Sequence, residues 1–67
     1  MTSKEEAMII QSLFGYMSDK WHEDGHVVSV SEMYEYLLVG YDVVFEDSYL
    51  EELRMIFVEE LEEEKYE

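Results

Sequence analysis

The chain has 67 residues, and its 18 acidic residues against four basic ones give a formal net charge of −14. Because 48% of the residues are hydrophobic, it is not one of the acidic, apolar-poor chains that stay unfolded for lack of surface to bury. Its length allows one domain, and the absence of cysteine excludes disulfides and thiolate metal sites. We expect residues 1–67 to form a single cytoplasmic domain and a complete product, without a signal peptide or a membrane helix.

The first predicted helix covers about residues 4–23. Ser3 and Glu6 have the spacing of a capping box, in which each side chain satisfies the free amide of the other residue. Gly25 is a natural stop, because glycine readily adopts the left-handed conformation that ends many helices. The apolar face of this helix recurs at helical spacing and consists of Ile10, Leu13, Phe14, Met17 and Trp21.

A short second helix is predicted over residues 31–39, with an extended segment on either side. The β-branched segment 27–30 precedes it, and either Ser29 with Glu32 or Ser31 supplies its cap. Gly40 is expected to end it. Its buried side is predicted to consist of Met33, Tyr34 and Leu37. The other extended segment, residues 43–45, can pair with the first as a small ribbon if helices cover one side of it.

The last predicted helix covers residues 48–65. Ser48 and Glu51 form a third possible capping box. One face of the helix is apolar and consists of Leu50, Leu53, Phe57 and Leu61. The predicted fold class is therefore mainly α, a compact three-helix domain with two short extended segments. Four aromatic side chains are expected in its core, namely Phe14, Trp21, Phe45 and Phe57.

Acidic residues are concentrated toward the end of the chain, where ten of the eighteen lie within the last 22 residues. At about 100° per residue, five acids of the last helix point away from its apolar face. Like-charge pairs one turn apart, such as Glu59 and Glu63, destabilise a helix by roughly 0.2–0.5 kcal/mol. Only Arg54 and Lys65 offset them. Stability alone does not explain this pattern, which is either an ordinary solvated face or a surface for a positively charged partner.

The candidate partner-binding surface begins after the second predicted helix and continues along the third. Carboxylates one turn apart lie about 5–6 Å from each other, which is comparable to the phosphate spacing along a nucleic-acid strand. Met55 lies among them, either as a tolerated exposed side chain or as the anchor of a contact. The candidate residues are Asp42, Glu46, Asp47, Glu51, Glu52, Met55, Glu59, Glu62 and Glu63.

Two sequence patterns suggest metal binding but lack the required context. Residues 22–26 fit the H-E-x-x-H string, which needs both histidines on one intact helix, and Gly25 is expected to end the helix between them. Residues 24–32 resemble half of a calcium loop, but Lys20 and His22 stand where oxygen ligands are needed. There is no nucleophile motif and no phosphate-binding loop. We expect no metal, no cofactor and no enzymatic activity.

A small, cysteine-free, strongly acidic and helix-rich chain resembles the nucleic-acid mimics that bacteriophages use against host proteins. In size and charge it is most similar to the phage inhibitors of the histone-like nucleoid protein HU. The resemblance spans the whole chain but is one of composition, because these mimics share no sequence motif. It implies an inhibitor that fills the DNA-binding surface of a basic, HU-like host protein in the host cytoplasm and binds neither nucleic acid nor membranes itself.

A second interpretation is an acidic interaction module, or a small homodimer, that docks through an apolar face. Ile9 and Tyr16 widen the apolar arc of the first helix beyond what a three-helix core requires, so that arc is a candidate dimer face. Clustered tyrosines favour a place in the core, because tyrosine readily lies half buried, and can also line a protein-binding surface. These tyrosines are Tyr34, Tyr36, Tyr41 and Tyr49.

Overall fold

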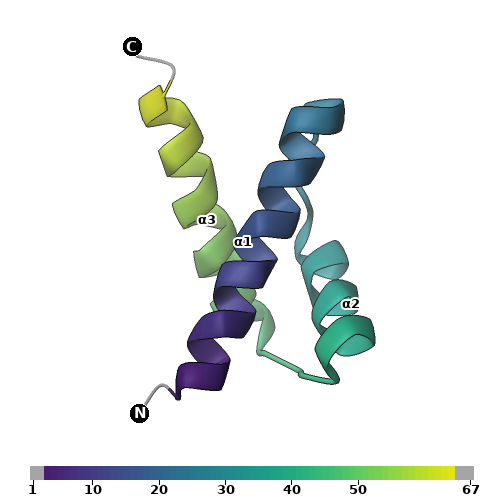
Figure 1. Ribbon diagram of the computed structural model, residues 1–67. Coiled ribbons are helices and arrows are strands. Elements are labelled where there is room, and N and C mark those ends of the chain that lie inside the picture. Colours follow the sequence, from purple (N-terminus) through teal and green to yellow (C-terminus); the bar gives the residue numbers. More distant parts are fainter. Residues whose placement is uncertain (1–2, 65–67) are drawn as a thin grey trace.

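The computed structural model describes residues 3–64, which form three helices. They are α1 (Lys4–Asp24), α2 (Val30–Tyr41) and α3 (Asp47–Glu64). α1 and α3 run in the same direction and α2 runs in the opposite one (Figure 1). α2 packs against both of the other helices. The mainly α architecture predicted from the sequence is therefore confirmed.

Both ends of α1 are formed by the residues that the sequence indicates. The Ser3 hydroxyl accepts a hydrogen bond from the backbone N–H of Glu6 at 3.1 Å. At the other end, Gly25 adopts the left-handed conformation with φ 66° and donates its N–H to the carbonyl of Trp21 at 2.8 Å. A residue with a Cβ is strained at this φ, so glycine suits the position.

The second helix begins one residue earlier than predicted and ends two residues later, although one of its two predicted caps is confirmed. In its capping box, the Ser29 hydroxyl accepts from the N–H of Glu32 at 3.3 Å, and the Glu32 carboxylate accepts from the N–H of Ser29 at 3.0 Å. Gly40 does not end α2. Asp42 takes the left-handed position instead, with φ 56°, and donates its N–H to the carbonyl of Leu38 at 3.0 Å. Aspartate is one of the few non-glycine residues that adopt this conformation.

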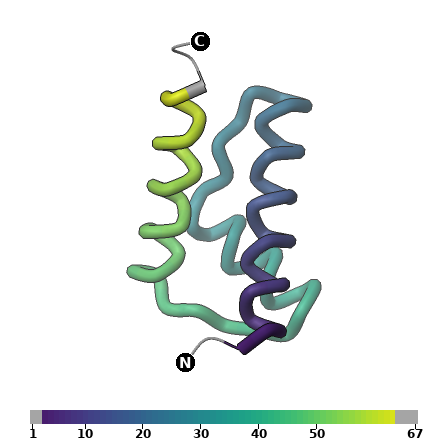
Figure 2. Tube along the Cα trace, turned by 60° about the vertical axis from the view of Figure 1, so that its left-hand side comes forward, coloured from purple at the N-terminus to yellow at the C-terminus, as the bar shows by residue number. Residues whose placement is uncertain are grey.

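The predicted ribbon of residues 27–30 and 43–45 does not form, because the described residues 3–64 contain no strand. Val28 is fully buried in the core, and its carbonyl accepts a hydrogen bond from Nε of Arg54 at 2.9 Å. The N–H of Val43 turns back to the carbonyl of Leu37 at 3.3 Å. Both segments thus satisfy backbone groups with α2 and α3 rather than with each other. Figure 2 shows the first connection running from the end of α1 back down to the start of α2.

The third helix starts one residue earlier than predicted. The carbonyl of Glu46 accepts from the N–H groups of Tyr49 and Leu50, each at 3.1 Å, so the helix begins at Asp47. Ser48 therefore lies inside the first turn and is not the cap that its spacing to Glu51 suggests. The predicted end at Lys65 lies outside the described residues.

The core consists of residues from all three helices and from the first connection. Its buried members are Leu13, Met17, Val28, Met33, Leu37, Leu50, Leu53 and Phe57. Apart from Val28, each of them lies on a predicted apolar face. No helix among residues 3–64 combines the length and the apolar composition needed to cross a membrane.

Several predicted core residues lie at the edge of the core instead. Tyr34 is 37% exposed, and Tyr36 packs inward in its place, stacked on Tyr16 with ring centroids 4.3 Å apart. Three of the four aromatic residues expected to be buried are only half-buried, namely Phe14, Trp21 and Phe45. A chain of this length buries too little volume to enclose every large ring.

Candidate functional site

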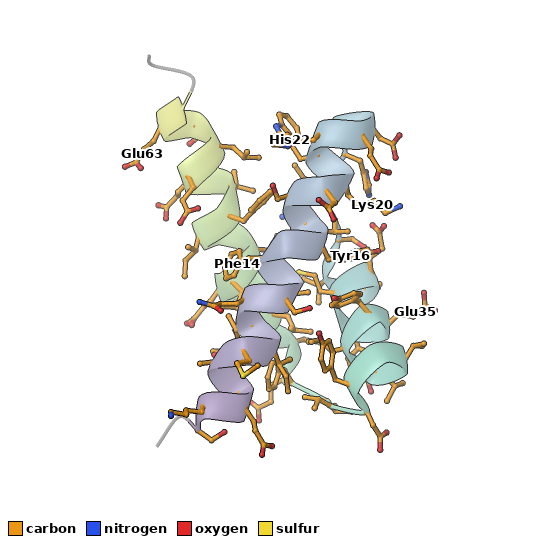
Figure 3. The ribbon with its side chains drawn as sticks, viewed as in Figure 1. Phe14, Tyr16, Lys20, His22, Glu35 and Glu63 are labelled. Carbon is orange, nitrogen blue, oxygen red and sulfur yellow. The ribbon has the colours of Figure 1, made fainter. Side chains whose placement is uncertain are left out.

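The carboxylates singled out in the sequence are all exposed. On α3 they lie opposite the buried residues Leu50, Leu53 and Phe57, because the helical period places acids and apolar residues on opposite sides. Figure 3 shows Glu63 pointing away from α1. The exposed acids of the candidate surface are Asp42, Glu46, Asp47, Glu51, Glu52, Glu59, Glu62 and Glu63.

Four acids near the end of α3 gather around one exposed apolar side chain. A shallow hollow of about 480 Å³ is lined by Ile56 together with Glu59, Glu60, Glu62 and Glu63. The last turn of the helix contains no basic residue. Negative charge at this end opposes the helix dipole, and it adds to the repulsion between acids one turn apart. This arrangement therefore costs folding free energy.

Protein cations compensate little of this charge. Among the described residues, α3 has one ion pair, between Nη1 of Arg54 and Oε1 of Glu51 at 4.0 Å. The guanidinium is directed mainly toward the core side, where its Nε donates to the carbonyl of Val28. Arg54 thus ties α3 to the first connection. Within residues 3–64, no cation forms an ion pair with the four acids around Ile56.

The exposed apolar residues of α3 differ from the sequence expectation. Met55 is 56% exposed, as expected for a residue on the acidic face, but it does not line the acidic hollow. Ile56, which is 46% exposed, lines that hollow and also the groove described next. A signal for Ile56 exists in the sequence, since Met55, Ile56 and Phe57 are consecutive and one helix face buries only one of them. The helical period places Phe57, and not the other two, on the apolar face of the helix.

A groove of about 500 Å³ lies between α1 and α3. Phe14 and Phe57 come together in it from the two helices, with ring centroids 6.4 Å apart. Figure 3 shows Phe14 on the side of α1 that faces α3. A Cβ added at Gly15 would meet no heavy atom within 4 Å. The lining residues are Phe14, Gly15, Ser18 and His22 from α1, and Ile56, Phe57, Glu60 and Leu61 from α3. Sequence reasoning missed this groove because it requires knowing how the two helices diverge.

The two histidines serve local structure. Nδ1 of His22 donates to the carbonyl of Ser18 at 3.1 Å, and α1 ends before His26, so the two rings are not on one helix. Nε2 of His26 lies 2.9 Å from Oε1 of Glu32. The pKa of Glu32 is lowered to about 2, first by the N–H of Ser29 and then by His26. Residues 3–64 contain no cluster of three side chains able to hold a metal ion.

On the α1–α2 side, two tyrosine hydroxyls form hydrogen bonds with the same serine. The hydroxyl of Tyr36 lies 2.7 Å from that of Ser12, and the hydroxyl of Tyr41 donates to Ser12 at 2.5 Å. Ile9 and Tyr16, the predicted dimer face, are half-buried and pack against the core. Ile9 also lines a surface hollow together with Met8 and Tyr41. The exposed apolar residues include Met8, Leu38, Val39, Tyr41 and Val44.

No protein-family model matches the chain, and neither a curated protein nor a solved structure resembles it significantly.

Proposed function

We propose that this protein is a DNA mimic of the bacteriophage type, which binds the nucleic-acid-binding surface of a basic host protein and blocks its binding to DNA. The target class is an HU-like nucleoid protein in the bacterial cytoplasm. The observation that carries the proposal is the row of exposed carboxylates on α3, of which only Glu51 has a cationic partner within the described residues. The protein acts by occupying a surface, and it needs neither a cofactor nor a reaction.

The folding free energy lost to the row of carboxylates on α3 supports a role of that row in binding. Like-charge pairs such as Glu59 and Glu63 each destabilise the helix by roughly 0.2–0.5 kcal/mol. A chain of this size has only about 3–10 kcal/mol of folding stability to lose. A positive surface reverses that cost, because each carboxylate then gains a nearby cation, and the partner releases its counterions as it does on DNA.

The arrangement also suits rapid association. A face of one sign steers an oppositely charged protein and raises the encounter rate, and salt weakens this effect. The carboxylates lie on a helix, so their relative positions are set before the partner arrives. We therefore expect fast, salt-sensitive binding in which DNA and this protein exclude each other.

The test is competition with DNA for a purified HU-type protein. In the test variant, glutamine replaces Glu52, Glu59, Glu62 and Glu63, and Glu51 stays because it pairs with Arg54. The control removes four exposed acids from α1 and α2, through Glu5→Gln, Asp19→Asn, Glu23→Gln and Glu35→Gln. Both variants carry the same net charge. Loss of DNA displacement in the test variant alone supports the proposal, and equal behaviour of the parent and both variants refutes it.

A second candidate function is an acidic module that docks through an apolar surface, with a homodimer as one form. Its support is a hollow of about 540 Å³ lined in part by Met8, Tyr41 and Val43, in which Met8 is 68% exposed. Binding through this surface would change little with salt, because burial of apolar area is not screened. A salt series of partner affinity therefore distinguishes the two functions.

A further inference from the structure

The groove between α1 and α3 is a largely apolar surface feature next to the acidic face. Its apolar members are Phe14, Phe57 and Leu61, with Ile56 on its outer side. α2 contributes none of the lining residues, although it packs against both helices. In Figure 1 the later parts of α1 and α3 diverge. Within residues 3–64, the groove is therefore lined by two helices and is not covered by the third.

The charge of the groove is asymmetric. On the α3 side, Glu60 lines the groove, and Ile56 joins the groove to the hollow formed by Glu59 and Glu63. On the α1 side, the polar lining residues are Ser18 and His22, so α1 adds no carboxylate. Cations of a ligand are thus favoured along one side of the groove, and apolar groups are favoured at its floor.

We propose that this groove binds a cationic amphipathic helix of the partner, with an apolar side chain inserted between Phe14 and Leu61 and with lysine or arginine facing the acids of α3. The proposal rests on the proposed function in that the partner is a basic protein. A helix fits because it can pack along two diverging helices and present apolar and basic residues on adjacent faces. A partner segment in extended conformation could not bind by strand addition, since residues 3–64 contain no sheet edge with which it could pair.

A second copy of this chain is the less suitable occupant. Each copy has a formal charge of −14, so a dimer through this groove would bring further acid to Glu59, Glu60 and Glu63. The repulsion would oppose association. A basic partner reverses the sign of this interaction. Steering by the acids and anchoring by the groove are then successive parts of one binding event.

Blocking the groove without changing charge tests the proposal. Gly15→Leu places a side chain into the groove, where a Cβ meets no heavy atom within 4 Å. Gly40→Leu is the matched control, because Gly40 is also an exposed helical glycine with no heavy atom near a Cβ and lies outside the groove. Leucine favours helix over glycine, so both variants are expected to fold. Circular dichroism checks this.

We expect Gly15→Leu to weaken binding to the HU-type protein by about tenfold, roughly the effect of excluding one leucine-sized side chain from a buried site. Gly40→Leu should bind like the parent. Ile56→Gln, which removes the apolar wall and keeps the charge, should also weaken binding. The slope of affinity against salt should be the same for all four proteins. Equal affinity of Gly15→Leu and Gly40→Leu overturns the groove proposal.

A model ligand separates failure of this proposal from failure of the proposed function. The probe is a synthetic lysine–leucine peptide with its leucines on one helical face, and its control has alanine in place of each leucine. The parent and Gly40→Leu should prefer the leucine peptide, and Gly15→Leu should not. If this preference holds while the HU-type protein does not bind, the groove stands and the partner class is wrong. If both peptides bind the parent equally, or sedimentation shows a dimer that Gly15→Leu dissociates, the groove proposal is wrong.

Discussion

The α1–α2 side of the molecule and the outer face of α3 differ in what their polar side chains contact. On the α1–α2 side, Tyr36 and Tyr41 share hydrogen bonds with Ser12, and Glu32 binds both Ser29 and His26. On α3, the ion pair between Glu51 and Arg54 is the one contact of this kind that the described residues provide for the acidic face. Polar groups of the first region hold the fold together, whereas those of the second oppose it. This difference is the observation behind our proposal that the acids of α3 bind a positively charged partner.

The largest expected effect comes from the core that both regions share. Leu37→Ala removes a fully buried side chain and should cost about 2–5 kcal/mol of unfolding free energy. Since the whole stability is only about 3–10 kcal/mol, the variant should be partly or fully unfolded. Urea unfolding followed by circular dichroism measures this. Glu59→Ala, at an exposed position of α3, is the control and should not destabilise the protein.

Arg54 is expected to matter through its hydrogen bond rather than through its ion pair. Arg54→Met leaves the partly buried carbonyl of Val28 without its donor and should cost about 1–3 kcal/mol. Glu51→Gln removes only an exposed ion pair and should change stability by less than about 1 kcal/mol. Lys4→Met controls for the lost positive charge. Equal destabilisation by Arg54→Met and Lys4→Met would mean that the hydrogen bond contributes nothing.

Two glycines should respond to alanine in opposite directions. Gly25→Ala forces a Cβ into a left-handed conformation and should cost about 1–2 kcal/mol, although nothing lies near the added atom. Gly15→Ala lies inside α1 and should stabilise the protein by up to about 1 kcal/mol, because alanine favours helix. Thermal unfolding of both variants measures the difference. A stabilising Gly25→Ala would contradict the assignment of Gly25 as the cap.

Glu32 should make the α1–α2 side sensitive to acid. Its folded-state pKa of about 2 lies below the ordinary value of 4.5, so its stabilisation is complete above about pH 4.5 and is lost as the pH falls toward 2. Glu32→Gln removes this contribution, and Glu35→Gln on the same helix is the control. The unfolding free energy of Glu32→Gln should therefore fall below that of the control at neutral pH and approach it in acid. A constant difference between the two variants would contradict the assignment.

The smallest expected effect is that of salt on stability. Screening shortens the reach of like-charge repulsion to about 10 Å at 0.1 M ionic strength, so the Tm should rise by a few degrees as salt is added. The variant in which glutamine replaces Glu52, Glu59, Glu62 and Glu63 should start from a higher Tm and gain less. A Tm that falls with salt would mean that ion pairs such as Arg54–Glu51 outweigh repulsion.

Helix boundaries and the exposure of the acids were predictable because they depend on neighbours in the sequence. Ser3 and Ser29 find their hydrogen-bond partners three residues later, and Gly25 needs only its own lack of a Cβ. The helical period alone places the α3 acids opposite Leu53 and Phe57. The exceptions are the end of α2, where Asp42 rather than Gly40 is the cap, and the start of α3, where Ser48 lies inside the first turn.

Tertiary structure decided which apolar groups are covered and which backbone groups are satisfied across the molecule. Val28 is buried and bonded to Arg54, 26 residues away, so its segment does not pair as a strand. Tertiary structure also creates the groove beside Phe14, because this groove exists only where α1 and α3 diverge. Helix capping is local, since a backbone group finds its partner within one turn, and the sequence alone identified the caps Ser3, Gly25 and Ser29. Burial and grooves depend on the relative placement of whole helices, and no short stretch of sequence encodes that placement.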